Sequence, residues 1–136
     1  MPSANADGAR ENKADKTNKT DKFNLAERTA RFGETVVGFA RSIGIDAVTS
    51  PLIKQVVRSA TSVGANYCEA DEAGSKKEFR YRISVCNREV RETKHWLRML
   101  AVSSPQRKDQ ARLLWKEANE LNLIFSAIFR KSKPTR

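Results

Sequence analysis

The chain has 136 residues, 39% of them hydrophobic, and a formal net charge of +10. This length suits a single domain with a substantial core. No stretch approaches the roughly 20 apolar residues of a membrane span, so we expect a cytoplasmic protein with no membrane partner.

Residues 1–22 are expected to form a disordered polar tail. After Met1 they contain no aromatic residue and no aliphatic residue larger than Ala. Such a segment buries too little apolar surface to offset the entropy of ordering, and it lacks the apolar run of about 7–15 residues that a signal peptide needs. The folded domain is therefore expected at residues 23–132, followed by a short tail at 133–136.

The excess positive charge lies in the second half of the chain. Residues 1–22 hold five basic and four acidic side chains, and residues 46–74 hold two basic and four acidic ones. The segments 75–102 and 103–136 each hold eight basic and three acidic side chains. Elements that are expected to fold carry this charge, which favours a polyanionic partner.

The first predicted helix begins at a capping-box pattern, Asn24 followed by Glu27, with Phe23 as the preceding staple residue. Apolar residues then recur at helical spacing, and the helix is expected to end near residues 42–44. The pattern predicts one amphipathic helix with a single buried face.

The second predicted helix begins at Ser50-Pro51, with Ser50 as the N-cap, and ends at Gly74 as a C′ glycine. Gly64 lies inside it at a cost of roughly 1 kcal/mol against Ala. Close approach of another helix would compensate for this cost. A merely tolerated glycine is the alternative.

The third predicted helix begins at a capping box formed by Ser75 and Glu78 and runs to about residue 101. Ser104-Pro105 opens the fourth helix, which ends before Pro134. Apolar residues follow heptad spacing along the third helix: Phe79, Ile83, Cys86, Val90, Thr93, Leu97 and Leu100. Four amphipathic helices with short connections predict an all-α fold, an antiparallel up-and-down four-helix bundle.

A polar network is expected between the second and third helices. If they fold back about Gly74, Arg58 lies level with Glu92, and Glu89 lies within a turn of Ser62. Solvated surface charge is the alternative interpretation. The residues assigned to this network are Arg58, Ser62, Asn66, Glu69, Glu89 and Glu92, with Arg80 or Arg82 facing Glu69.

A basic stripe is predicted on the third helix, well away from its core line. Phosphate binding and plain solubility are both compatible with such a stripe. The stripe contains no aromatic residue for base stacking, which favours recognition of backbone or shape. The residues assigned to nucleic acid are Lys77, Arg80, Arg88, Arg91 and Arg98, with Arg107, Lys108 and Arg112 extending the surface.

A third sector of the same helix is apolar, which makes its apolar arc wider than one bundle seam needs. Such extra faces are typical of subunit contacts, so a homo-oligomer is expected, although a thick internal core is the alternative. The residues assigned to the oligomer interface are Tyr81, Val85, Trp96, Met99 and Trp115.

The sequence contains no recognisable set of catalytic residues. Cys68 and Cys86 are expected as buried thiols, with a disulfide as the alternative. Together with a distant His95 they do not make a zinc site. Glu89 and Glu92 lack the Glu-x-x-His partner of di-iron bundles. We therefore expect no cofactor, no metal and no enzymatic activity.

Two segments carry a resemblance to a known family: Arg58-Ser-x-x-Ser-x-Gly-Ala-Asn-Tyr-x-Glu-Ala70, and Glu89-x-x-Glu92-Thr93-x-x-Trp96-Leu97. Residues 23–132 resemble the four-helix bundle proteins whose founding members are encoded within intervening sequences of bacterial 23S rRNA genes. The resemblance implies a homopentameric ring. It also implies kinship with the accessory protein of diversity-generating retroelements, which binds nucleic acid and a reverse transcriptase. No catalytic residues carry over.

The sequence thus favours a non-enzymatic, homo-oligomeric bundle that binds structured RNA through its basic surface. The alternative is a scaffold that binds a protein partner, such as a reverse transcriptase, with its positive charge serving solubility.

Overall fold

The structure, a computed structural model, describes residues 24–133. This part of the chain folds into four α-helices: α2 (Leu25–Arg41), α3 (Thr49–Asp71), α4 (Lys76–Ser103) and α5 (Lys108–Lys131). A 3₁₀ turn, η2 (Pro105–Arg107), precedes α5. The predicted tail of residues 1–22, the staple residue Phe23 and residues 134–136 lie outside the described residues.

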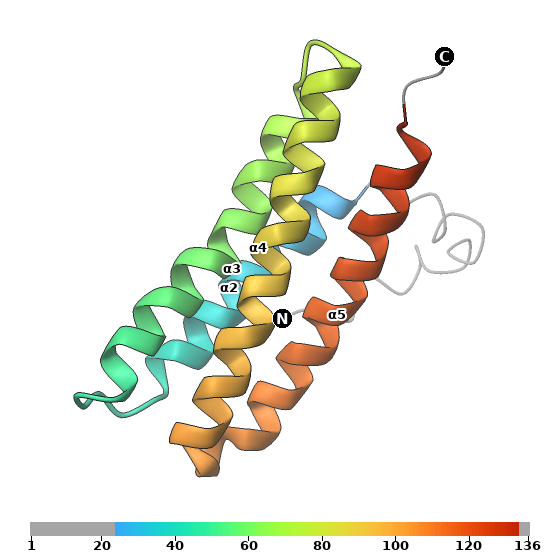
Figure 1. Ribbon diagram of the computed structural model, residues 1–136. Coiled ribbons are helices and arrows are strands. Elements are labelled where there is room, and N and C mark those ends of the chain that lie inside the picture. The colour runs from blue at the N-terminus through green and yellow to red at the C-terminus, as the bar shows by residue number, and fades with distance from the viewer. Residues whose placement is uncertain (1–23, 134–136) are drawn as a thin grey trace, which may run out of the picture.

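The helices pack antiparallel in sequential order, which confirms the all-α up-and-down bundle. Figure 1 shows α3, α4 and α5 side by side, with α2 behind them. The seams α3–α4 and α4–α5 are the most extensive, α2 packs mainly against α3, and α2 meets α5 at few points. As a result α4 lies between two neighbours, and one face of the α4–α5 pair is left open to solvent.

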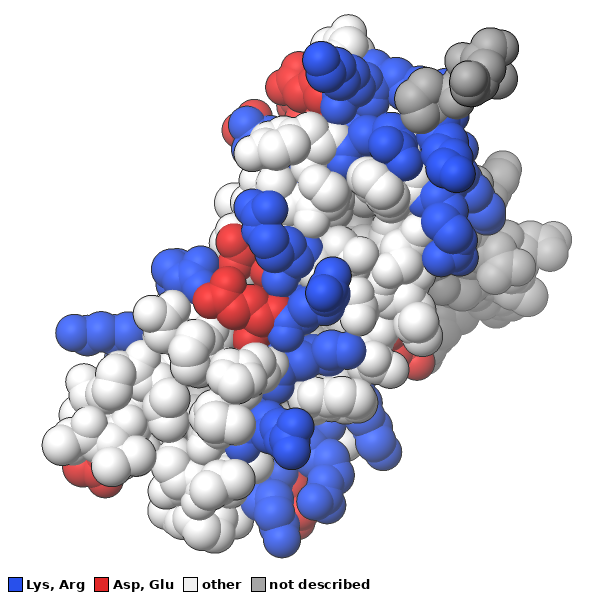
Figure 2. Space-filling view, viewed as in Figure 1, with Lys and Arg blue, Asp and Glu red and all other residues white. Residues whose placement is uncertain are grey.

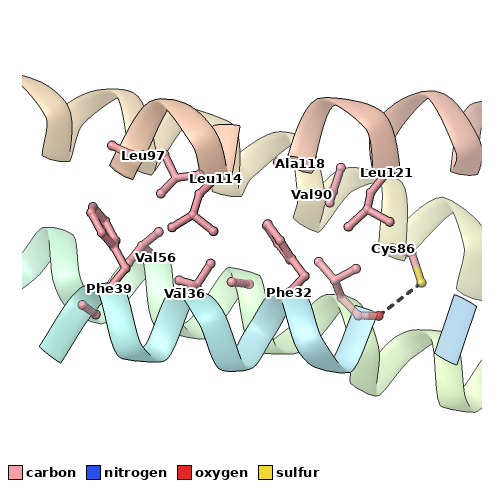
Figure 3. Packing of buried hydrophobic residues seen from close by; sticks show 14 of the residues in the cluster. Phe32, Val36, Phe39, Val56, Cys86, Val90, Leu97, Leu114, Ala118 and Leu121 are labelled. Carbon is pink, nitrogen blue, oxygen red and sulfur yellow. Dashed lines mark hydrogen bonds between the residues drawn. The ribbon is translucent and has the colours of Figure 1, made fainter. Parts of the chain in front are cut away.

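The predicted core line of α4 is confirmed. Six of its seven residues are buried and Phe79 is half-buried. Figure 3 shows Phe32, Val36 and Phe39 of α2 meeting apolar side chains of the other helices. The α5 line is buried from Ala111 to Phe125. Spacing of three and four residues therefore located the buried face of each helix.

Gly64 lies where α2 crosses α3, as close helix approach requires. A β-carbon at position 64 would lie 3.4 Å from backbone atoms of Thr29 and Ala30. One turn further along the crossing, a β-carbon at Gly33 would lie 3.5 Å from the backbone of Ala60 and Thr61. Side chains larger than a methyl group at either position would push the two backbones apart.

Three of the predicted helix termini are wrong in detail. Asn24 precedes α2 but forms no side-chain cap. Before α3, the Asp46 carboxylate accepts the N–H groups of Val48 and Thr49 at 2.8 Å, so Asp46 caps the helix and Ser50 lies inside it. These hydrogen bonds lower the pKa of Asp46. Gly74 has no positive φ and is not a C′ glycine, because α3 ends at Asp71.

The capping of α4 is close to the prediction. The Ser75 hydroxyl accepts the N–H of Glu78 at 3.1 Å, and the Glu78 carboxylate accepts the N–H of Gly74 rather than that of Ser75.

The start of the fourth helical segment differs from the prediction. Pro105 lies at the first position of η2, but Ser104 provides no side-chain cap there. The Ser104 carbonyl oxygen instead accepts the N–H of Arg107 at 2.8 Å.

Candidate nucleic-acid interface

The solvent-facing side of the α4–α5 pair carries a concentration of exposed basic side chains. Figure 2 shows Lys and Arg gathered over these two helices, with the largest cluster of acidic residues at the boundary with α3 and smaller acidic patches elsewhere. Within residues 24–133, six of these basic side chains form no ion pair and no side-chain hydrogen bond. We call this surface the α4–α5 basic face, made up of Arg88, Arg91, Arg98, Lys108, Arg112 and Lys116.

Glu89 and Glu92, the two acidic residues in the middle of α4, are held on the flank that meets α3. Arg58 of α3 donates to the Glu89 carboxylate at 3.2 Å and also contacts that of Glu92. Both carboxylates that the sequence offered as alternative partners are thus engaged by one guanidinium. The Glu89 side chain is 14% exposed. Neither carboxylate is left to neutralise the basic face.

Two of the three acidic residues of α5, Glu117 and Glu120, are held on its opposite flank, while Asp109 lies exposed in its first turn. Arg28 of α2 donates two hydrogen bonds to Glu117, at 2.8 and 2.9 Å, and a third to Glu120 at 3.3 Å. The Glu117 hydrogen bond raises the pKa of Arg28 above its ordinary value, so its charge is fixed. Sequence reasoning did not single out Arg28, because its partners lie 89 and 92 residues away.

The remainder of the expected polar network is smaller than predicted. Arg82 donates to the Asn66 side-chain oxygen at 3.0 Å, and the Asn66 amide donates to the backbone and hydroxyl oxygens of Ser62 at 3.0 Å. Glu69 is exposed and has no side-chain partner among the described residues. Arg82, which was expected at the level of Glu69, donates to Asn66 one turn earlier.

A ladder of polar side chains crosses the α4–α5 seam beneath the basic face. Lys94 donates to the side-chain oxygens of Asn119 and Asn122 at 2.9 and 3.2 Å. Asn122 donates to Asn87, which in turn donates to the Ser126 hydroxyl at 3.1 Å. Sequence reasoning did not find this ladder. The signal was present as Asn119 and Asn122, three residues apart beside the core line of α5.

Two of the arginines assigned to nucleic acid make contacts within the bundle. The Arg80 guanidinium lies 3.8 Å from the Phe129 ring centroid and donates to the Phe129 carbonyl oxygen at 3.3 Å. Arg107 donates through two nitrogens to the Ser42 carbonyl oxygen, at 3.2 and 3.3 Å. Lys77 is exposed near the first turn of α4, beside Arg80. The guanidinium groups of Arg80 and Arg107 are therefore already used inside the protomer.

The residues assigned to an oligomer interface lie on two helices and differ in exposure. Val85 is 6% exposed and lies inside the bundle, because it shares the flank of α4 that meets α3. Trp96 on that flank is half-buried and donates its indole N–H to Glu92 at 3.0 Å. Met99 is half-buried, while Tyr81 is 57% exposed. Trp115 lies apart from them on α5, beside the basic face.

The two cysteines occupy different environments, and both are free thiols. Cys86 is buried and its thiol lies 3.6 Å from the Val63 carbonyl oxygen, a contact drawn in Figure 3. Burial raises the pKa of Cys86 to about 12. Cys68 is exposed, so the expectation of two buried thiols was wrong for Cys68. It lies in the shallow groove between α2 and α3.

Within residues 24–133, no three His, Cys, Asp or Glu side chains come together in a way that could hold a metal ion. In the same range no helix combines the length and the apolar composition that a membrane crossing requires. The α4–α5 basic face is dominated by arginine and lysine, and such side chains bind phosphate groups.

Comparisons with known proteins identify the family. The family described as "23S rRNA-intervening sequence protein" matches residues 21–127. A crystal structure of a protein of unknown function from the S23 ribosomal protein family of Bacteroides thetaiotaomicron is similar, with a TM-score of 0.66 and 25% sequence identity. The similarity covers 76% of this chain and 96% of that one. No curated protein matches. The chain belongs to the 23S rRNA-intervening sequence protein family.

Proposed function

We propose that this protein is a non-enzymatic bundle that binds nucleic acid, with structured RNA as its preferred ligand, through the α4–α5 basic face. The observation that carries the proposal is the segregation of charge. The carboxylates that form ion pairs between helices lie on the outer flanks of α4 and α5, where they pair with Arg58 or Arg28. The arginine and lysine side chains of the basic face, which lie between these flanks, are exposed and form no ion pair within residues 24–133.

This separation of basic from acidic side chains favours binding of a polyanion over a role of the positive charge in solubility alone. Interspersed charges of both signs keep a surface soluble, and a single-sign field instead attracts an oppositely charged partner. Arg88, Arg91 and Arg98 lie within three turns of one helix, so their side chains can contact successive phosphates of one backbone.

We infer that the protein acts as a homo-oligomer. The bundle leaves large apolar side chains exposed, among them Tyr81 at 57%, Leu113 at 66% and Leu123 at 64%. Covering such side chains between copies would remove apolar surface from water. Light scattering on the purified protein measures the native mass, and a pentamer would give five times the 15.3 kDa of one chain.

The experiment that tests nucleic-acid binding is fluorescence anisotropy with a labelled RNA hairpin across a salt series. The test variant is Arg88→Glu/Arg91→Glu, which spares the structural residue Arg80. The control is Arg31→Glu/Lys54→Glu, which makes the same change in charge at exposed positions of α2 and α3. All proteins are compared at equal native mass after nuclease treatment.

We expect log affinity to fall linearly with log salt, and the test variant to bind much more weakly than the control. Two lost phosphate contacts would reduce the slope by about 1.4 to 1.8. Equal weakening in both variants would mean that only net charge matters. Absence of binding by the wild-type protein near physiological salt would favour the protein-scaffold alternative instead.

A further inference from the structure

A groove opens where the last turns of α4 run beside the first turns of α5. Its volume is about 540 Å³, within the ~300–1,000 Å³ typical of small-ligand sites. Leu97 and Ala111, both almost completely buried, lie at its base, and Ala101 and Val102 line the α4 side. The groove therefore offers an apolar surface within the α4–α5 basic face.

The remaining lining residues are basic or aromatic. Arg98 comes from α4, and Lys108, Arg112 and Lys116 come from the first turns of α5. None of these four side chains forms an ion pair within residues 24–133, and no acidic residue lines the groove. Four positive charges around an apolar floor favour a ligand that combines anionic groups with an apolar surface.

Trp115 is the aromatic residue of the groove, and it is held in place on one side. Lys94 approaches its ring from the side of Asn119 and Asn122, with the ammonium nitrogen 5.0 Å from the ring centroid. Ala111, at the groove base, precedes Trp115 by one helical turn. Trp115 is 38% exposed, so its side chain is partly fixed by the protein and partly open.

We propose that this groove accepts an unpaired nucleobase of an RNA strand, stacked against Trp115, while the neighbouring phosphates contact Arg98, Arg112 and Lys116. The proposal rests on the function proposed above and narrows its substrate class to RNA with unpaired nucleotides. A base within a duplex is stacked between its neighbours and cannot enter the groove, whereas an unpaired base presents an open π-face. The basic side chains would contact the phosphates of single-stranded RNA and of duplex RNA alike.

The test compares a labelled single-stranded oligoadenylate of about 12 nucleotides with a perfectly paired RNA duplex of the same length. Anisotropy measures the affinity of both probes for the wild-type protein and for Trp115→Ala. Loss of one base-stacking contact would weaken binding of the single strand about 5- to 150-fold, equivalent to ~1–3 kcal/mol. Duplex affinity is expected to change little, because its phosphate contacts remain.

A second measurement does not depend on Trp115→Ala folding correctly. The chain has two tryptophans, so Trp96→Phe leaves Trp115 as the sole indole. Stacking of adenine on that indole is expected to quench its fluorescence on titration with oligoadenylate. Inorganic polyphosphate supplies the negative charge without a base and is expected to bind with little quenching.

The outcomes separate this inference from the function on which it rests. Equal single-strand affinity of Trp115→Ala and the wild-type protein overturns the stacking site, while weaker binding by Arg88→Glu/Arg91→Glu would leave nucleic-acid binding standing. Equal quenching by polyphosphate also overturns it, because any polyanion would then fill the groove. A change in native mass in Trp115→Ala would assign the groove to a second copy of the chain. If the wild-type protein binds neither RNA, both proposals fail.

Discussion

Ser59 of α3 and Thr93 of α4 share a hydrogen bond of 2.8 Å in the closed interior between the two helices. Both residues are completely buried. The Thr93 hydroxyl also donates to the Glu89 carbonyl oxygen at 2.8 Å, which leaves Ser59 as the donor of the shared bond. This hydroxyl pair fixes the register of α3 against α4 directly beneath the ion pairs of Arg58.

Replacing Thr93 with Val is expected to lower the free energy of unfolding by about 1–3 kcal/mol, because the buried Ser59 hydroxyl loses its acceptor across the seam. Adding Ser59→Ala to this variant is expected to cost less than Ser59→Ala does alone. Urea unfolding of the two single variants and the double variant measures the coupling. Strictly additive effects would show that the two hydroxyls do not interact in solution.

Removing Arg58 is expected to destabilise the protein by about 1–2 kcal/mol. An exposed ion pair contributes ~0–1 kcal/mol and the breaking of a buried one costs ~3–5 kcal/mol. Arg58 is 48% exposed while Glu89 is 14% exposed, so the loss falls between these cases. The comparison is Arg58→Ala with Lys54→Ala, an exposed base on the same helix, by urea unfolding. Equal midpoints would show that the network contributes nothing to stability.

The two thiols are expected to differ greatly in reactivity. In the native protein a disulfide reagent such as DTNB should modify Cys68 rapidly and leave Cys86 protected, because Cys86 is buried and its pKa is raised to about 12. Unfolding in urea should expose the second thiol. Cys68→Ser is the control and should show no fast phase. Rapid modification of both thiols in the native protein would indicate that the core opens near Cys86.

The stability of the α3 terminus is expected to depend on pH through Asp46. Hydrogen bonds from Thr49 and Val48 lower its pKa in the folded state below the ordinary value of 3.8. Its contribution is therefore present above pH 3.8 and is lost as the pH falls through the lowered folded-state pKa. Asp46→Ala should unfold at a lower urea concentration than the wild-type protein at neutral pH, and the difference should shrink in acid. A constant difference across this range would contradict the cap.

The sequence predicted those features that depend on neighbours within one helix. Heptad spacing located the buried side of α4, and Ser75 with Glu78 located its first turn. The cap of α3 was misassigned because Ser50-Pro51 satisfies the local preferences of a helix start, while Asp46 reaches the terminus from an irregular loop.

Features that depend on which helices become neighbours were beyond local patterns, except where a short turn fixed the partner, as it did for Arg58 and Glu92. The apolar arc of α4 is wide, but its width does not reveal that Val85 is buried within the protomer. The sequence placed Trp115 among interface residues and Arg112 among phosphate ligands, whereas the packing of α5 on α4 brings both into one groove. Arg28 was overlooked because its carboxylate partner Glu117 lies at the other end of the sequence.

The uneven packing of α2 has a consequence for the order in which the bundle opens. α2 is the shortest α-helix of the described chain, with 17 residues, and it meets α5 at few points apart from Arg28. Its detachment would leave the extensive α3–α4 and α4–α5 seams intact, so the backbone amides of α2 should exchange with solvent before those of α4. Hydrogen exchange followed by mass spectrometry would then show early exchange in α2 and slow exchange in the remaining three helices, α3, α4 and α5, which retain the whole basic face. Uniform exchange across all four helices would instead indicate a bundle that opens as one unit.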